Sequence, residues 1–161
     1  MAFTFKQLSA QGLFEGYASL FGIVDQTHDR VAPGAFRRTL LRRPPAGIKM
    51  LYQHLAHEPI GVWERIIEDA RGLYVRGRLV LDSARGRDVL ALMRAGAIDG
   101  LSIGFRTVRG QTDQQTGVRT ILEIDLWEVS VVTFPMLPGA RVLRVKGAQG
   151  APALHTANSD Q

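Results

Sequence analysis

Ser102 has the residue type and the surroundings of a nucleophile. The segment from Asp99 to Phe105 reads DGLSIGF, with Gly100 and Gly104 two residues to either side of Ser102. In an extended strand alternate side chains share a face, so Leu101 and every second residue after it are expected to point into the core and Ser102 to point away from it. The neighbouring glycines leave room for a peptide backbone to approach the hydroxyl. An ordinary surface serine on a strand would show the same pattern, so these residues alone assign no role.

A serine nucleophile needs a base, and the candidate bases lie upstream of it. The G-x-S-x-G pattern also marks the elbow of α/β-hydrolases, but there the histidine follows the serine. Here the only histidine after Ser102 is His155, in a polar tail. His54 ends a predicted strand and His57 follows three residues later. A neutral imidazole accepts a proton at neutral pH, so either of these two histidines is a candidate base.

A metal site is the alternative use of the upstream histidines. His28, His54 and His57 could together supply nitrogen ligands. The His-x-x-His pair in a predicted loop, however, lacks the helical spacing and the following glutamate of a zinc protease. The pattern therefore disfavours a metal, and no cofactor is expected.

Glu128 is the carboxylate that could orient a histidine. It lies in the segment DLWEVSVV, which reads as the last strand. Strict alternation predicts two faces, one with Trp127, Val129 and Val131 and the other with Leu126, Glu128, Ser130 and Val132. A carboxylate among apolar side chains is costly unless it is paired. An imidazole N–H would pair it and fix the histidine tautomer, although a salt bridge to one of the 20 basic residues would also do so.

The elements that must position these residues are mostly short strands punctuated by glycine, proline and aspartate. Strands are predicted at 13–21, 48–54, 60–68, 73–81, 101–108, 118–124 and 126–134, and a first helix at 33–41. A second helix is expected from a cap at Asp82 or Ser83 to Ala95, with Gly96 ending it. Its core-facing residues are predicted to be Val89, Leu92 and Met93. The count favours a β-rich α+β fold, a small closed or half-open β-barrel of about seven strands with flanking helices.

Composition indicates a single soluble domain. The chain has 161 residues, of which 45% are hydrophobic and 22% charged, and it contains no cysteine. No apolar run approaches the roughly 20 residues that span a bilayer, and the first residues lack the pattern of a signal peptide. We expect one domain at 1–146 and a disordered tail at 147–161, which has few large apolar residues.

The chain carries a net charge of +5, which raises the alternative of a basic barrel that binds nucleic acid. The arginines are nevertheless spread along the chain, and no helix-turn-helix, zinc or RNA-binding signature is present. No specific nucleic-acid partner is therefore expected.

Five segments in one order resemble the caudovirus prohead protease family, the capsid-maturation proteases of tailed bacteriophages. They are Gly16-Tyr17-Ala18, Tyr52-Gln53-His54 followed by Pro59-Ile60-Gly61, Gly72 to Val75, Asp99 to Phe105, and Leu126 to Ser130 with the nearby Pro135. The similarity runs from about Glu15 to Val142. This family is distantly similar to herpesvirus assemblin, so the resemblance implies a herpesvirus-protease-like β-barrel and serine protease activity.

The resemblance also implies roles for three residues. Ser102 would be the nucleophile and His54, directly after Tyr52-Gln53, its base in preference to His57. Glu128 falls where assemblin has its second histidine. Assemblin supports its oxyanion hole with paired arginines, whereas this chain reads FPMLPG at 134–139 with Arg141 slightly later. The loop 135–139 is the remaining candidate for the oxyanion donors.

The implied biology is cleavage of the scaffold, or of the scaffolding segment of the major capsid protein, inside the prohead in the host cytoplasm. Self-cleavage is also implied, and the tail at 147–161 is the expected place for it. The resemblance admits contacts with the portal protein and with further copies of this chain, but no membrane. A catalytically inactive assembly module with the same barrel remains the second alternative.

Overall fold

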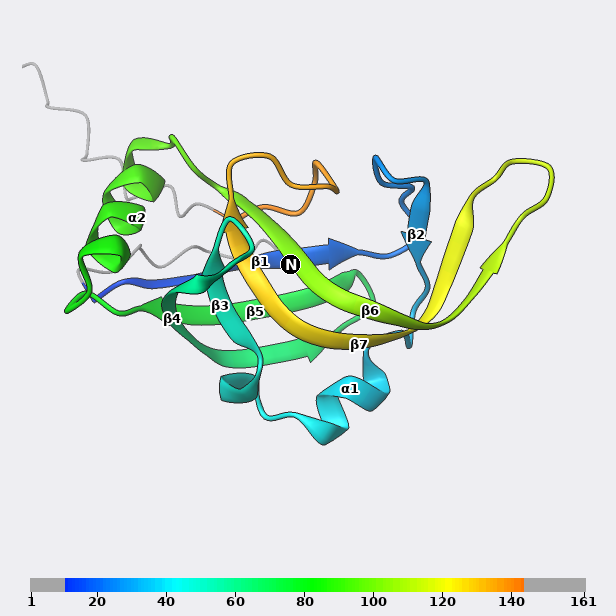
Figure 1. The fold of residues 1–161 in the computed structure, drawn as a ribbon, viewed down its shortest axis with the longest axis horizontal. Helices are drawn as coiled ribbons and strands as arrows, with labels where there is room; N and C mark the ends of the chain where they lie inside the picture. The colour runs from blue at the N-terminus through cyan, green and yellow to red at the C-terminus, as the bar shows by residue number, and fades with distance from the viewer. Residues whose placement is uncertain (1–10, 144–161) are drawn as a thin grey trace, which may run out of the picture.

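A strongly curved sheet with two helices at its margins makes up the protein (Figure 1). The computed structural model describes residues 11–143. The elements are β1 (Leu13–Leu20), β2 (Asp29–Val31), α1 (Arg37–Arg42), a 3-10 turn (Pro45–Gly47), β3 (Lys49–Tyr52), β4 (Leu55–Glu68), β5 (Gly72–Leu79), α2 (Ala84–Ala95), β6 (Gly100–Thr112) and β7 (Arg119–Val132). No helix in this part of the chain has the length and apolarity needed to cross a membrane.

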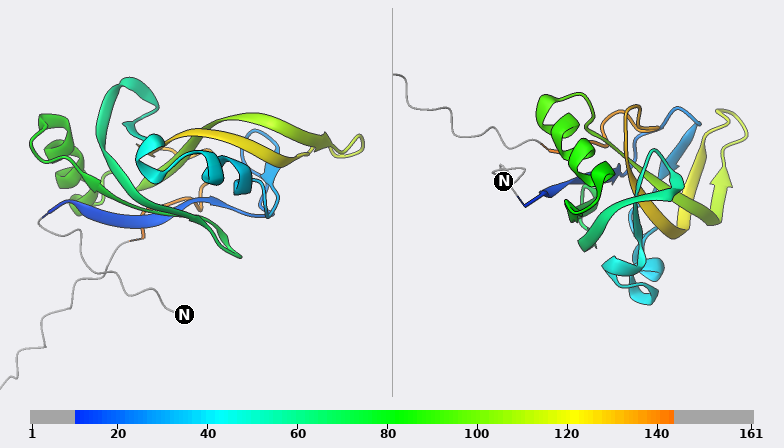
Figure 2. Two further views of the ribbon diagram at one scale, coloured as in Figure 1. Left: turned by 90° about the horizontal axis from the view of Figure 1, so that it is seen from below. Right: turned by 60° about the vertical axis from the view of Figure 1, so that its left-hand side comes forward.

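The sheet curls until its two sides nearly meet. Its strand order is β1-β5-β4-β3-β7-β2, and β6 pairs with β7 off this path. Both views in Figure 2 show the curl. Between β1 and β6 the chain inserts its own segment from Ala140 to Leu143, with bridges from Arg141 to Gly100 and from Val142 to Gly16. The predicted half-open barrel of about seven strands is thus confirmed, and this inserted segment forms its seam.

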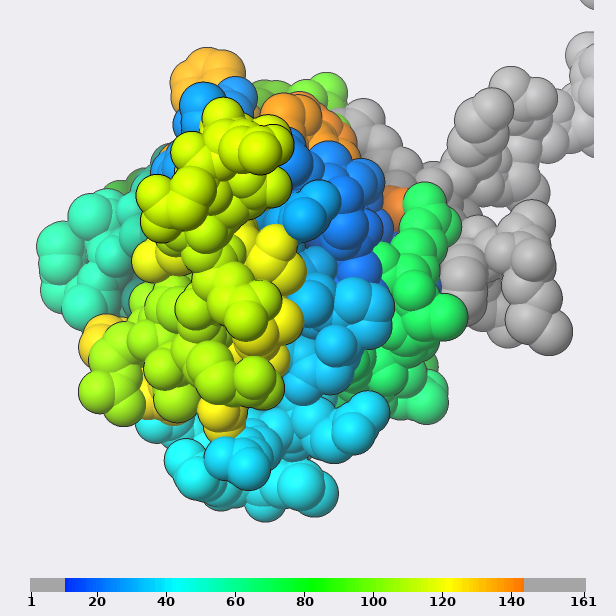
Figure 3. Space-filling view, turned by 90° about the vertical axis from the view of Figure 1, so that its right-hand side faces the viewer, coloured from blue at the N-terminus to red at the C-terminus, as the bar shows by residue number. Residues whose placement is uncertain are grey.

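Strands β6 and β7 form the longest hairpin and carry two of the three predicted site residues. Its far end stands at the surface next to the segments of β2 and α1, as Figure 3 shows from that side. Near the site the two strands are paired residue for residue, with Ser102 opposite Ser130 and Gly104 opposite Glu128. The next pair is Phe105 with Leu126, so one residue of β7 is left over. A β-bulge of this kind bends the strand and re-aims the side chains that follow it.

The bulge corrects the predicted faces of β7. Trp127 is the extra residue and is 53% exposed, whereas Leu126 and Val129 are fully buried. The parity of inward and outward positions therefore changes at Trp127, and Leu126 lies in the core rather than on the face of Glu128. Strict alternation was wrong here because one inserted residue shifts every side chain on one flank to the other face.

Other differences from the prediction are local. The strands predicted at 118–124 and 126–134 are one continuous β7, since the bulge absorbs the irregularity without ending the ladder. Strand β3 stops at Tyr52, before His54, and β2 has only three residues, too few for a sequence pattern.

The first helix, predicted at 33–41, is α1 at Arg37–Arg42, because residues 33–36 form a turn instead of its first helical turn. Helix α2 follows its predicted end signals but not its predicted face. Ser83 caps α2 by accepting from the N–H of Gly86, and Gly96 ends it in the left-handed region with a φ of 78°. The buried face of α2 uses Leu90 beside Val89 and Met93, while Leu92 is 40% exposed, which corrects the predicted face. The predicted tail at 147–161 lies outside the described residues.

Candidate active site

The turn between β3 and β4 delivers the imidazole of His54. Tyr52 pairs with Leu55, so the connection has only two residues, Gln53 and His54. Both have positive φ, 54° and 60°, as in the tight hairpin turns usually built from Asn and Gly. Figure 1 shows this turn rising beside the end of β7, to which β3 is joined by parallel pairing. The tight turn therefore places His54 against β7.

Glu128 is the partner of the His54 ring. The Nδ1 atom of His54 lies in a short hydrogen bond with Oε1 of Glu128. The Glu128 side chain is 12% exposed and that of His54 is 41% exposed. The second carboxylate oxygen accepts the hydroxyl proton of Ser130 at 2.7 Å. With both carboxylate oxygens occupied and Nδ1 held, Nε2 of His54 is the ring atom left for another group.

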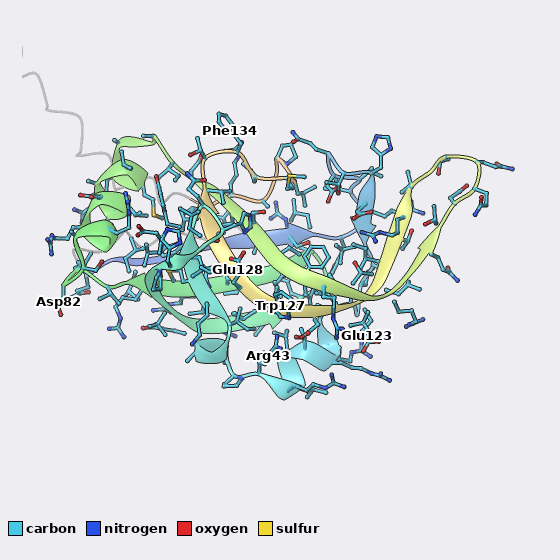
Figure 4. All side chains as sticks on the ribbon, viewed as in Figure 1. Arg43, Asp82, Glu123, Trp127, Glu128 and Phe134 are labelled. Carbon is cyan, nitrogen blue, oxygen red and sulfur yellow. The ribbon has the colours of Figure 1, made fainter. Side chains whose placement is uncertain are left out.

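Glu128 fits this position because the residue opposite it is a glycine. A Cβ atom added at Gly104 would lie 2.2 Å from Oε1 and 2.6 Å from Cδ of Glu128. The carboxylate therefore occupies the space that any other side chain would fill. In Figure 4 the label of Glu128 lies beside β3. The label of Trp127 lies closer to that of Arg43, toward α1.

Ser102 lies on the same face as this pair. It is directly opposite Ser130, and Gly104 is directly opposite Glu128, so these four positions form one patch of the hairpin. Opposed residues have Cβ atoms about 4.5–5.5 Å apart. Because the backbone N–H of His54 donates to Oγ of Ser130 at 3.0 Å, Ser130 is the common neighbour of the histidine turn and the serine. The structure thus brings all three predicted residues to one patch.

A cavity of about 310 Å³ opens beside Ser102, which is itself 6% exposed. It lies between the second half of β1, the β2 segment, β6 and the loop after β7. Its walls are mainly apolar, and its polar end holds Asp29, whose carboxylate accepts two bonds from Arg119 at 2.9 and 2.6 Å. The apolar part of the lining includes Leu20, Leu101, Ile103, Phe105, Met136 and Leu137. An extended apolar segment reaching Ser102 would find its contacts here.

Other sequence candidates lie outside this constellation. His57 is exposed on β4 and His28 is exposed in the turn before β2. Within residues 11–143 no group of three or more His, Cys, Asp or Glu side chains is arranged to hold a metal ion. Arg141 donates to the carbonyl of Pro138 at 2.8 Å and to the carboxylate of Asp99 at 2.6 Å, so its guanidinium holds the loop after β7.

Sequence reasoning missed the supporting residues of the site. Ser130 was placed on the face of Glu128 but given no role, although a serine two residues from a buried carboxylate on one strand is a readable signal. Gln53 had no signal, since glutamine is not a turn former. Gly104 was interpreted as space for a substrate, whereas its missing side chain makes space for Glu128.

The fold of this site is shared with solved viral proteases. The solved structure of the bacteriophage T4 capsid assembly protease, gp21, matches with a TM-score of 0.57 at 19% identity, covering 74% of this chain and 80% of that one. A KSHV protease bound to a hexapeptide phosphonate inhibitor matches with a TM-score of 0.56 at 14% identity, covering 83% and 64%. At these identities the likeness concerns the fold alone, and it confirms the predicted herpesvirus-protease-like barrel.

The sequence comparisons are more specific. The prohead protease of Enterobacteria phage HK97 is 38% identical over 143 residues, which cover 87% of this chain and 63% of that protein. The chain therefore spans less than two thirds of the length of this relative. The family model described as caudovirus prohead serine protease matches residues 3–152. The match includes the histidine turn, the serine strand and the glutamate strand, and on this ground the chain belongs to the caudovirus prohead serine protease family.

Proposed function

We propose that this chain is a serine endopeptidase of prohead maturation, with Ser102 as nucleophile, His54 as base and Glu128 as the group that orients the base. The observation that carries the proposal is the bond between Nδ1 of His54 and the buried Glu128 carboxylate, on the face of the hairpin that also holds Ser102. A histidine held at Nδ1 by a carboxylate presents its other nitrogen to a hydroxyl.

The mechanism follows from these positions. Nε2 of His54 takes the Ser102 proton as Oγ attacks the peptide carbonyl, and the carboxylate of Glu128 stabilises the imidazolium that forms. The imidazolium then protonates the leaving amine, so the peptide C–N bond breaks and an ester to Ser102 remains. A water molecule, deprotonated by the same nitrogen, hydrolyses this ester and regenerates the serine. The backbone N–H groups of the loop 135–139 remain the candidates for stabilising the oxyanion.

The proposed substrates follow from family membership. They are the scaffold, or the scaffolding segment of the major capsid protein, and the protease itself, cleaved inside the prohead in the host cytoplasm. The apolar cavity beside Ser102 supports binding of an extended peptide with an apolar side chain near the cut. Contacts with the portal protein or with a second copy of this chain belong to the same proposal.

A serine-directed probe tests the proposal without a known substrate. We expect a fluorophosphonate to label the wild-type protein on Ser102, with EDTA leaving the rate unchanged, and we expect Ser102→Ala to remain unlabelled. Peptide mass spectrometry locates the label, and Ser83→Ala, which removes a serine hydroxyl at the start of α2 and outside the cavity lining, is the control. A folded wild-type protein that resists labelling would favour the inactive assembly module. Equal cleavage of the capsid protein by wild type and Ser102→Ala would refute the proposal.

Replacing Gly104 by alanine is expected to lower the labelling rate about 10²-fold, the order of loss that a displacement of about 1 Å produces at a catalytic site. The added methyl group would overlap Oε1 and Cδ of Glu128, so the carboxylate must move away from His54. Gly47→Ala is the matched control, since its nearest neighbour would be a Pro44 side-chain atom at 3.4 Å. Stopped-flow measurement of the labelling rate would contradict the assignment if both variants reacted at the wild-type rate.

A further inference from the structure

The two-residue turn of Gln53 and His54 is hydrogen-bonded to β7 and to the residue after it. The proposed mechanism does not use these contacts. We propose that Ser130 and Gln53 are positioning residues: together they hold the left-handed turn so that the His54 imidazole stays between Glu128 and Ser102. This inference rests on the proposed function, since it concerns how the same base is kept in place.

Ser130 is the first fastening point. Its hydroxyl group accepts the backbone N–H of His54 at 3.0 Å and donates to Oε2 of Glu128 at 2.7 Å. The residue is fully buried, so water cannot take over either bond. One hydroxyl therefore fixes both the main chain that carries the base and the carboxylate that orients the base. His54 is held at two points, the ring by Glu128 and the backbone by Ser130.

Gln53 is the second fastening point. Its backbone N–H donates to the carbonyl of Val131 at 3.0 Å, which extends the β3–β7 ladder into the turn. Its side-chain amide makes two bonds with Thr133: Nε2 donates to Oγ1 at 2.6 Å, and Oε1 accepts the Thr133 backbone N–H at 3.1 Å. The amide thus bridges the turn and the first residue beyond β7.

The backbone conformation explains why the turn needs these contacts. Residues with a Cβ atom are disfavoured in the left-handed region, and here Gln53 and His54 occupy it in succession. Such conformations persist where the surrounding structure over-determines them, typically at functional sites. His54 cannot be a glycine, because its ring is the base. Position 53 could hold a glycine, which adopts this conformation without strain. The side chain of Gln53 therefore contributes through its contacts with Thr133 and not through the shape of the turn.

The test compares two positioning variants with two matched controls. In Gln53→Gly the strain at residue 53 is relieved while the bridge to Thr133 is lost, and in Ser130→Ala the shared hydroxyl is lost. His28→Gly relieves another non-glycine residue of positive φ, 64°, outside the site. Thr39→Val removes a buried hydroxyl that accepts the N–H of Leu126 on the same strand β7.

The rate measured is that of Ser102 labelling by a small fluorophosphonate, resolved into its maximal rate and its half-saturating concentration, with thermal unfolding recorded alongside. We expect the maximal rate to fall about tenfold in Gln53→Gly and about 10²-fold in Ser130→Ala, with half-saturation unchanged. The unfolding midpoint of Gln53→Gly should not fall, whereas Thr39→Val should unfold earlier yet label normally. Thr133→Ser keeps the hydroxyl that accepts from Gln53 and should label at the wild-type rate, whereas Thr133→Val lacks it and should label more slowly.

The outcomes separate this inference from the proposed function. If Gln53→Gly and Ser130→Ala label at the wild-type rate while Ser102→Ala and His54→Ala do not label, the positioning role is wrong and the catalytic assignment stands. If Ser130→Ala fails to fold, Gln53→Gly decides the question. A fall in rate that only tracks loss of stability, with Thr39→Val equally slow, would also overturn the positioning role. Labelling of Ser102→Ala at the wild-type rate would remove the proposed function.

Discussion

Turnover of a peptide substrate is expected to fall about 10⁶-fold when either Ser102 or His54 is replaced by alanine, because the loss of the nucleophile or of its base removes the whole proton-transfer unit. The double variant is expected to be no slower than either single variant, since the two residues act as one unit. Quantitative gel analysis of capsid-protein cleavage, with enzyme in large excess for the slow variants, measures the effect.

His57→Ala is the control for this prediction. It removes an imidazole three residues along the chain, on an exposed position of β4. We expect its turnover to stay within a few-fold of wild type. A large loss in His57→Ala with little loss in His54→Ala would exchange the roles of the two histidines and would contradict the geometry in which Nδ1 of His54 contacts Glu128.

Glu128→Gln is expected to lower turnover about 10⁴-fold, because in serine proteases an amide in place of the triad carboxylate favours the wrong histidine tautomer. The amide is also neutral, so it stabilises the imidazolium less. The substitution keeps the shape of the side chain, and the fold should survive it. Single-turnover kinetics at saturating substrate would show the loss in the chemical step rather than in binding.

The matched control makes the same chemical change elsewhere on β7. Glu123 is paired with Arg38 at 3.3 Å, and the Arg38 side chain is 70% exposed. The Glu123 side chain is itself only 15% exposed, close to the 12% of Glu128, and its partner Arg38 lies on α1, away from the histidine turn. Glu123→Gln should therefore be active at the wild-type rate. If Glu128→Gln behaved in the same way, Glu128 would be a structural carboxylate and the site would be a serine–histidine pair.

The sequence predicted the elements whose ends carry local signals. Helix α2 begins at a serine cap and ends at a left-handed glycine, as expected from Ser83 and Gly96. The break between the strands predicted at 60–68 and 73–81 is a turn closed by Asp69, whose carboxylate accepts the N–H groups of Arg71 and Gly72 at 2.8 and 3.0 Å. Side-chain caps and turns act within a few residues, and for this reason they are readable from sequence.

The features that sequence reasoning missed depend on distant partners. The turn at Gln53 and His54 has no local propensity for its conformation. It is held by Ser130 of β7 and by Thr133 just beyond β7, in contacts that span 76 and 80 positions of the chain. The bulge at Trp127 is visible only in the register with β6. The three residues proposed for the site could be put forward by type and order, because a carboxylate on a buried strand, a serine beside glycines and an upstream histidine each carry a chemical requirement. Their supports were not, because the contacts that define them are tertiary.

The segment from Ala140 to Leu143 sets a limit to the proposed self-cleavage on the C-terminal side. Leu101 donates to the carbonyl of Ala140, and Leu143 donates to the carbonyl of Glu15, so this segment ties together strands that otherwise do not pair. A cut after Leu143 leaves that tie whole. A cut before Ala140 would release the segment that joins the strand of Ser102 to β1. An enzyme cut there would lose the closure of its barrel and, with it, its activity.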